Sequence, residues 1–354
     1  MKGSHRHTIR TINGGLWLLL LLPLALLSWR QLTLPAGEAW RPWVDGRNAR
    51  QIENVYDQQF VLRDWSTNAW AAMDFKLFNE GRPGVVVGRQ GWLFTREEMT
   101  WSADSSRFLS ANLDEMAAVA RQLQQANIQL VPVLIPAKSD IYADQVIGAN
   151  PQQQAELYDL ALHGLQQRGI QVTDLRPALR QARQQQPVFL HTDTHWTPFG
   201  AAQVAQAIAA SLGEQDSAHR FKTTAGQPQV YRGDLLNYIP VSPHFDSWGP
   251  AADQLVVPVT EDSAATDLLA TPAPVTRALV GTSYSANERW NFAGALRQAT
   301  GQDLNNYAVE GKGPFVPMRD WLSSTDLAKS GLRSVIWDIP VRYLVQSFPR
   351  STHK

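Results

Sequence analysis

Apolar and polar positions along the middle of the chain follow two alternating spacings, one typical of helices and one typical of strands. Apolar residues at helical spacing predict helices at 112–125 and 152–167, a continuous apolar run predicts a strand at 128–135, and a further short strand is expected at 170–175. Strands that alternate with helices are typical of a parallel sheet covered by helices. We therefore expect an α/β fold with an open, mostly parallel sheet and helices on both faces.

The same alternation continues toward the C-terminus. We expect strands at 276–280, 304–309 and 334–339 and a helix at 287–300. A further helix is expected to run to Leu212, with Thr197 as its N-cap and Pro198 as its first residue. A threonine hydroxyl accepts from the free N–H groups of the first turn, and proline is favoured there because it needs no such partner.

Three segments lack this regular alternation. Residues 84–94, reading GVVVGRQGWLF, place a Gly-Arg-Gln-Gly turn between two apolar runs and so predict a β-hairpin. Residues 52–78 carry apolar positions at mixed spacing, which indicates one or two helices. Residues 213–274 are polar, contain prolines and show little periodicity, so we expect an insertion or a set of loops over one face of the domain.

The N-terminus combines a basic leader with a short apolar segment. Residues 16–27 contain no polar side chain and are interrupted only by Pro23. Three basic residues and no acidic residue precede them, at Lys2, Arg6 and Arg10. This layout is typical of an export signal. Residues 28–31, reading SWRQ, make a poor cleavage site, so we expect an uncleaved membrane anchor helix.

These segments predict three parts of the chain. The parts are a cytoplasmic basic leader with a signal-anchor at 1–30, a linker at 31–50 and one folded domain at 51–354. Basic flanks of an anchor tend to stay in the cytoplasm, which places the folded domain on the other side of the membrane.

Composition excludes some classes of function. The 354 residues include 32 basic and 32 acidic side chains, so the chain lacks the basic excess of a nucleic-acid-binding protein. Cysteine is absent, so a nucleophile must be something other than a thiol. Tryptophan is abundant, with 13 residues, and indole rings pack in cores as well as against sugars.

A serine lies where the chemistry of an α/β fold is usually found. In residues 280–286, reading VGTSYSA, Ser283 follows a strand that ends at a glycine and precedes a helix. This geometry places its hydroxyl at the carboxyl edge of the sheet. Ser283 is therefore a candidate nucleophile, and the backbone N–H groups of Ser283 and Tyr284 are candidate donors to an oxyanion. Alternatively, Ser283 or Ser285 only caps the helix.

A second polar segment, HTDTHW at 191–196, offers a base for that serine. Asp193 and His195 are two residues apart, so both side chains point to one side of an extended segment. The carboxylate can orient the imidazole, whose other nitrogen can deprotonate a serine hydroxyl. Two alternatives remain at this point: a zinc site formed by His191, Asp193 and His195, or a polar loop whose aspartate caps a turn.

Together these segments resemble the AlgJ/AlgX family of alginate O-acetyltransferases, whose catalytic domains are related to SGNH hydrolases. The resemblance rests on an ordered set of short motifs: GRQGWLF at 88–94, LIPAK at 134–138 with Tyr142, DTHW at 193–196, GTSYS at 281–285, NYA at 306–308 with GKGPF at 311–315, and VIWDIP at 335–340. Thr282 stands where many SGNH proteins have aspartate. The uncleaved anchor and the absence of a carbohydrate-binding module after residue 344 make the chain more similar to AlgJ than to AlgX.

The resemblance implies an SGNH-hydrolase-like acetyltransferase domain with Ser283 as nucleophile, His195 as general base and acid, and Asp193 as its orienting carboxylate. It implies acetyl transfer to an exported polysaccharide, most simply alginate, without a metal or another cofactor. It also implies a membrane-bound O-acyltransferase that supplies acetyl, an anchor in the inner membrane and a catalytic domain in the periplasm. Two other functions remain open: an acetylesterase with the same triad, or a non-catalytic polysaccharide-binding scaffold of a secretion complex.

Overall fold

The computed structural model describes residues 21–23, 26, 44–60, 62–214, 220–263 and 274–349. Its contacts divide the chain into two units. The first unit holds the residues up to Leu77 together with Pro240–Gly249, and the second holds Phe78–Ile239 and Pro250–Lys354. The second unit contains the sheet and all the candidate site residues, whereas the domain that the sequence predicts starts at residue 51.

A four-stranded parallel sheet forms the centre of the second unit. Its order is β3-β8-β6-β7, with bounds β3 Gln129–Ile135, β8 Ser334–Pro340, β6 Arg277–Val280 and β7 Asn305–Asn306. The predicted α/β fold with a parallel sheet is therefore confirmed. Three of the predicted strands end within one or two residues of their expected bounds, and the strand expected at 304–309 is shortened to two residues.

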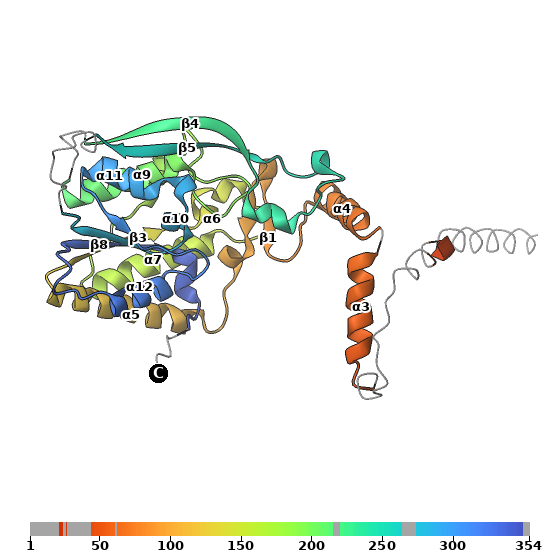
Figure 1. The fold of residues 1–354 in the computed structure, drawn as a ribbon, viewed down its shortest axis with the longest axis horizontal. Coiled ribbons are helices and arrows are strands. Elements are labelled where there is room, and N and C mark those ends of the chain that lie inside the picture. The colour runs from red at the N-terminus through yellow and green to blue at the C-terminus, as the bar shows by residue number, and fades with distance from the viewer. Residues whose placement is uncertain are drawn as a thin grey trace, which may run out of the picture. The chain divides into compact units, whose positions relative to one another are not determined.

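The strands alternate their side chains between two helical layers. Val131 and Val133 of β3 pack in one hydrophobic cluster, and Leu134 packs in the other. Figure 1 shows α9 and α11 over one face of the sheet and α5, α7 and α12 over the other. Their bounds are α5 Ser105–Gln125, α7 Gln152–Gln167, α9 Pro198–Leu212, α11 Phe292–Thr300 and α12 Phe315–Ser324. Both faces of the sheet are thus covered, and β3, β6 and β8 are mostly apolar for this reason.

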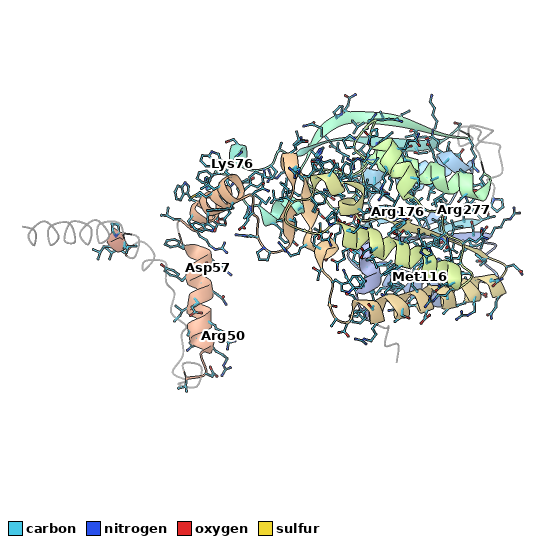
Figure 2. The ribbon with its side chains drawn as sticks, turned by 180° about the vertical axis from the view of Figure 1, so that it is seen from behind. Arg50, Asp57, Lys76, Met116, Arg176 and Arg277 are labelled. Atoms are coloured by element: carbon cyan, nitrogen blue, oxygen red, sulfur yellow. The ribbon has the colours of Figure 1, made fainter. Side chains whose placement is uncertain are left out.

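Most of the predicted helices occur where they were expected. α7 has the predicted bounds, and Thr197 caps α9 by accepting from the N–H of Gly200 at 3.0 Å. α5 begins at Ser105, seven residues before the predicted start. Its buried Met116 is labelled in Figure 2, which shows the molecule from behind. The helix predicted at 287–300 begins only at Phe292 because Asn291 adopts a left-handed conformation, with φ 51°.

The strand predicted at 170–175 is wrong. Ile170 and Leu175 are buried, but the segment between them has no neighbouring strand and leads into the short helix α8, Arg176–Ala182. The N–H of Leu175 donates to the hydroxyl of Tyr158 at 3.2 Å, and the N–H of Ile170 donates to the carbonyl of Leu165. The two buried end residues therefore pack into the core without forming a strand.

The polar stretch at 213–274 contains a β-ribbon that the sequence did not reveal. β4 (Phe221–Tyr231) pairs antiparallel with β5 (Asp253–Asp262), with an irregularity between Ala225 and Pro228. The ribbon packs over α9 and α11, as Figure 1 shows, so the predicted position over one face is correct. The expectation of loops failed because β4 is mostly exposed and both strands contain proline, which hides the two-residue period.

A small hairpin and the first unit complete the described chain. β1 (Val85–Val87) and β2 (Leu93–Thr95) pair antiparallel, as predicted. In the first unit, helices α3 (Arg47–Gln59) and α4 (Arg63–Met73) account for most of the helical prediction at 52–78. Apart from residues 21–23 and 26, the predicted anchor lies outside the described residues. None of the helices described in the structure is long and apolar enough to cross a membrane.

Candidate active site

The turn after β6 presents Ser283. β6 ends at Val280, Gly281 follows with φ 155°, and Thr282 caps the short helix α10, Ser283–Ala286. The hydroxyl of Thr282 accepts from the N–H of Tyr284 at 3.3 Å. Thr282, and not Ser283 or Ser285, is therefore the residue that caps this helix. The Ser283 hydroxyl remains available at the carboxyl edge of the sheet.

A buried carboxylate holds this turn from beneath. Asp338 of β8 accepts from the backbone N–H of Thr282 at 3.0 Å and from its hydroxyl at 2.6 Å. A side chain at position 281 would collide with the Asp338 carboxylate, so only glycine fits there. Burial raises the pKa of Asp338 to about 6, although the hydrogen bonds from Thr282 act in the opposite direction.

His195 lies between Ser283 and Asp193. Its Nε2 atom is 2.7 Å from the Ser283 Oγ atom, and its Nδ1 atom is 2.6 Å from the Asp193 Oδ1 atom. The three residues that the sequence singles out therefore form one continuous hydrogen-bonded row, from segments 88 residues apart. The side chains of Asp193 and His195 are 1% and 13% exposed, so the carboxylate is shielded from water while the ring still reaches the surface.

Both oxygens of Asp193 are fixed. Oδ1 accepts from the backbone N–H of His195 at 2.9 Å, in addition to the ring. Oδ2 accepts from the hydroxyl of Tyr231 at 2.8 Å and from the backbone N–H of Asp234 at 3.0 Å. Burial alone would raise the pKa of Asp193, but the hydrogen bonds and the charge of His195, with these N–H groups, lower it well below its ordinary value. Asp193 is thus ionised at neutral pH.

The metal interpretation of the HTDTHW segment does not fit the positions of its histidines. The ring of His191 lies against Trp92, with ring centroids 4.1 Å apart, and its Nδ1 atom is 3.4 Å from Asp253. His191 therefore points away from the row formed by Asp193 and His195. Within the described residues, one group close enough to share a cation consists of Asp193, His195 and Asp234. The ligand atoms of Asp193 and His195 already make the hydrogen bonds described above, and the Asp234 carboxylate accepts from Thr194, which favours the triad geometry.

Asp253 holds the loop that carries Asp193. Asp253 is the first residue of β5 and accepts from the backbone N–H groups of His191 and Thr192 at 2.7 and 2.9 Å. It also accepts from the hydroxyl of Thr192 at 2.5 Å. Burial acts to raise the pKa of Asp253, but the hydrogen bonds from His191 and Thr192 leave it below the ordinary value. A charged acceptor thus fixes two successive N–H groups immediately before Asp193.

Lys138 holds the same loop from the other side. Its ammonium group is buried and donates to the carbonyls of Leu93, His191 and Asp193, at 2.6, 3.0 and 3.0 Å. Burial lowers the pKa of Lys138 to about 8, while the charge of Glu98 opposes the shift. Lys138 therefore ties the loop to the hairpin strand β2, and Asp253 ties it to the ribbon.

Aromatic rings surround His195. The ring of Trp290 stacks on it with centroids 5.2 Å apart and an angle of 21°, and the ring of Tyr284 lies 4.7 Å away. The hydroxyl of Tyr284 donates to the carbonyl of Thr194 at 2.6 Å and accepts from Arg342 at 3.1 Å. These contacts restrict movement of the His195 imidazole away from the Ser283 hydroxyl.

The two candidate oxyanion donors differ in their surroundings. The N–H of Tyr284 already donates to Thr282, at the long distance of 3.3 Å. The N–H of Ser283 donates to no acceptor within the described part of the chain. It lies at the first position of α10, where N–H groups are left without partners inside the helix. The Ser283 amide is therefore the freer of the two.

Sequence reasoning found the row Ser283–His195–Asp193 but missed the residues that hold it. Tyr231, Asp234 and Asp253 lie in the polar stretch whose strands were not recognised, and nothing in its pattern marks them. Lys138 belongs to the LIPAK motif, but no role was assigned to it. One signal was available: a lysine three residues after a buried parallel strand lies at the carboxyl edge of the sheet, where functional side chains gather.

Comparison with known proteins agrees with this geometry. The family described as "SGNH hydrolase-like domain, acetyltransferase AlgX" matches residues 85–341, which include the whole row. The chain belongs to this family. A probable alginate O-acetylase AlgJ of Azotobacter vinelandii is 42% identical over 324 residues, which cover 88% of this chain and 82% of the relative. The corresponding AlgJ of Pseudomonas aeruginosa is 40% identical over 343 residues, covering 91% and 87%.

A solved structure extends the agreement to the fold. The O-acetyltransferase domain of Pseudomonas putida AlgJ superimposes with a TM-score of 0.70 at 37% identity, covering 77% of this chain and 96% of that domain. The resemblance to the AlgJ/AlgX family that the motifs indicated is thus confirmed, as is the SGNH-like parallel sheet. The AlgJ relatives also match more of this chain than AlgX of Pseudomonas putida does, since AlgX is 26% identical over 278 residues.

Proposed function

We propose that this chain is an O-acetyltransferase that carries acetyl as an ester of Ser283 and transfers it to hydroxyl groups of an exported polysaccharide, alginate. The observation that carries the proposal is the unbroken row from Ser283 through His195 to the ionised Asp193. The curated relatives named for alginate O-acetylation supply the acceptor, because they match most of the chain.

In the first half of the reaction, His195 makes Ser283 nucleophilic. The Ser283 Oγ atom attacks the carbonyl carbon of the acetyl donor while its proton passes to Nε2 of His195. The tetrahedral intermediate then expels the donor's leaving group, which takes the proton back from Nε2. Asp193 stays ionised throughout; it fixes the ring orientation and stabilises the imidazolium. The product is an acetyl-enzyme with His195 neutral again.

In the second half of the reaction, a hydroxyl of the polysaccharide is the nucleophile and Ser283 is the leaving group. A hydroxyl of the polysaccharide gives its proton to the neutral His195 and attacks the acetyl carbonyl carbon. When the intermediate collapses, Ser283 leaves and recovers the proton from Nε2, and the sugar carries the acetyl ester. In both halves the negative oxygen forms next to the first turn of α10, where the free Ser283 N–H is placed to donate to it.

We further propose that the domain works in the periplasm and is held at the inner membrane by the apolar segment at 16–27. The acetyl donor is then supplied by a membrane-bound O-acyltransferase, because acetyl has to cross the membrane before Ser283 can receive it. The basic leader and the poor cleavage site at 28–31 support the anchor. Sequencing the N-terminus of the mature protein tests it: a start near residue 40 would contradict a retained anchor.

The mass of the protein after exposure to an activated acetyl ester tests the reaction. We expect one acetyl increment on Ser283 in the wild type and none in Ser283→Ala. His195→Ala should also fail, since members of a triad act as a unit. Ser285→Ala is the matched control, because it lies in the same short helix without facing His195. Acetylation of Ser283→Ala at the wild-type rate would contradict the proposed nucleophile.

Adding candidate oligosaccharides separates transfer from hydrolysis. Both reactions use the same acetyl-enzyme, so only its fate distinguishes them. We expect acetylated oligomannuronate, detected by mass spectrometry, to accumulate faster than free acetate. Release of acetate alone, at a rate that no oligosaccharide changes, would make the protein an esterase instead.

A further inference from the structure

An exposed arginine lies at the edge of the active site without a function in the acetyl-transfer steps. Arg289 is the middle residue of the 3₁₀ helix η8, Glu288–Trp290, which follows α10 in the chain. The next residue, Trp290, is buried and stacks on His195. The backbone that carries Arg289 is therefore fixed against the catalytic histidine, while the Arg289 side chain reaches the surface.

Arg289 approaches the row from the side of Asp193. Its guanidinium carbon is 5.9 Å from the centre of the Tyr231 ring, and the hydroxyl of Tyr231 donates to Asp193. The charge of Arg289 acts to lower the pKa of Tyr231, whereas burial and the charge of Asp193 raise it. The guanidinium is thus separated from Asp193 by one side chain, that of Tyr231.

No carboxylate of the described chain lies within ion-pair distance of Arg289. Arg342, the other arginine close to His195, differs in this respect: it is buried, donates to Tyr284 and pairs with Glu97 at 3.3 Å. Arg342 is therefore committed to the fold. Arg289 keeps most of its donors free for a group that comes from outside.

Two carboxylates beside the site favour a cation where an anionic acceptor binds. Asp193 is ionised, and the neighbouring Asp234 is held by the N–H and hydroxyl of Thr194 at 2.9 and 2.7 Å. Burial and the charge of Asp193 raise the pKa of Asp234, while the hydrogen bonds from Thr194 lower it. A polyuronate carries one carboxylate on every sugar, so it would be repelled here unless a fixed cation met it.

We propose that Arg289 binds a carboxylate of the acceptor polysaccharide and so aligns a hydroxyl of a neighbouring sugar with the Ser283 acetyl ester. A guanidinium presents two parallel N–H donors that match a carboxylate, stays charged at every physiological pH and tolerates a position above an aromatic ring. This inference rests on the proposed function for the identity of the reaction. It adds the chemical group that the site recognises, and it names the residue that recognises it.

The test measures acceptor binding without turnover. The full chain carrying Ser283→Ala is titrated with oligomannuronate and, separately, with a neutral cello-oligosaccharide of equal length. Adding Arg289→Ala should weaken oligomannuronate binding by about tenfold or more, the loss expected for a hydrogen-bonded ion pair, and leave binding of the neutral sugar unchanged. Arg289→Lys should give an intermediate affinity because the charge remains without the two parallel donors.

A matched control and a second readout keep the result specific. Arg107 is also exposed and also lies over an aromatic ring, that of Phe108, but on α5; Arg107→Ala should not change either affinity. Acetyl-enzyme formation by Arg289→Ala shows whether the change reaches the triad. A fall there as large as the fall in oligomannuronate affinity would mean that Arg289 acts through Tyr231, which would overturn the proposal.

Two further outcomes would also overturn the proposal: equal oligomannuronate affinity with and without Arg289, or equal losses for the charged and the neutral sugar. Raising the salt concentration should weaken oligomannuronate binding in the presence of Arg289 more than in its absence. Failure of the wild type to form an acetyl-enzyme would instead refute the proposed reaction. The binding measurements would still decide whether Arg289 recognises a carboxylate.

Discussion

The carboxyl end of β6 and the β4–β5 ribbon both reach His195, but they are built differently. β6 is buried along its whole length and delivers Ser283 through a turn that Asp338 fixes from beneath. The ribbon is two strands wide, largely exposed on β4, and reaches the site with one end, where Tyr231 pairs with Asp253. From that end come the hydrogen bonds to Asp193 and to the loop before it.

The difference separates two tasks. The core of the sheet positions the nucleophile, and the ribbon positions the carboxylate and the histidine that activate it. A surface ribbon can change in sequence at little cost to the core, since few of its residues contribute to either hydrophobic cluster. Its end near the site is the exception, because there the buried Asp253 and the hydroxyl of Tyr231 make the hydrogen bonds that hold Asp193 and its loop. Substitutions at that end should therefore reduce activity much more than similar substitutions at the other end.

The largest effect should come from Asp253→Asn. Asparagine has one acceptor oxygen where Asp253 uses two, so the N–H groups of His191 and Thr192 could not both remain bonded. We expect the free energy of unfolding to fall by about 3 kcal/mol, the range for lost hydrogen bonds to a buried charge. Acetyl transfer should fall about 100-fold, because a shift of about 1 Å in a catalytic group has that effect.

Asp262→Asn is the control for this change. Asp262 ends β5 at the other end of the ribbon, where it pairs with Arg220 at 2.6 Å. Chemical denaturation and initial transfer rates, measured on both variants, check the comparison. Equal losses of activity would show that the ribbon acts as a whole and that its functional end has no special role.

A smaller effect is expected from Tyr231→Phe, which removes only the hydroxyl that donates to Asp193. Losing a hydrogen bond to a charged group should lower acetyl transfer by about tenfold. A hydroxyl that donates to a carboxylate favours its ionised form, so loss of this bond should raise the pKa of Asp193. Activity that needs the ionised carboxylate would then be lost at a higher pH than in the wild type as the medium is acidified. A pH–rate profile measures this shift of the acid limb.

Tyr158→Phe controls for the loss of a buried hydroxyl. Tyr158 donates to the carbonyl of Leu134 and accepts from the N–H of Leu175, under the sheet and away from the row. Its loss should lower stability without moving the acid limb. An acid limb that stays in place in Tyr231→Phe would show that the remaining N–H donors alone hold Asp193 ionised.

The sequence revealed the strands of the sheet for a physical reason. Parallel strands covered on both faces are apolar at every position, as in Val131 to Ile135, and such runs stand out from the rest of the chain. The same reasoning failed at Ile170 to Leu175, where two buried end residues flank a mostly polar segment that has no partner strand. The composition of a segment indicates whether it is buried, whereas its pairing with another strand depends on segments that are distant in the sequence.

The residues of the site also differ in whether the sequence alone could reveal them. Ser283 was predictable because a strand, a glycine and a helix follow one another locally, and Asp193 and His195 were predictable because they are two residues apart. Tyr231 and Asp253 could not be found, since their importance arises only when the ribbon brings them to a loop about 40 to 60 residues earlier in the chain. Neither lies in a pattern that differs from an ordinary polar surface strand.

The smallest effect is expected from Thr197→Ala. This change tests the contribution of helix α9 separately from that of the loop that precedes it. The Thr197 hydroxyl accepts from the N–H of Gly200 at 3.0 Å and donates to the carbonyl of Pro187 at 2.7 Å. Its removal should lower the free energy of unfolding by about 1 kcal/mol, the usual cost of a lost N-cap. Acetyl transfer should change less than about twofold, because Asp253 and Lys138, and not α9, fix the segment that carries Asp193. Thr197→Ser keeps the hydroxyl and should restore stability. A large loss of activity in Thr197→Ala with stability unchanged would mean that the start of α9 sets the position of His195, and the ribbon would then not be the element that holds the base in place.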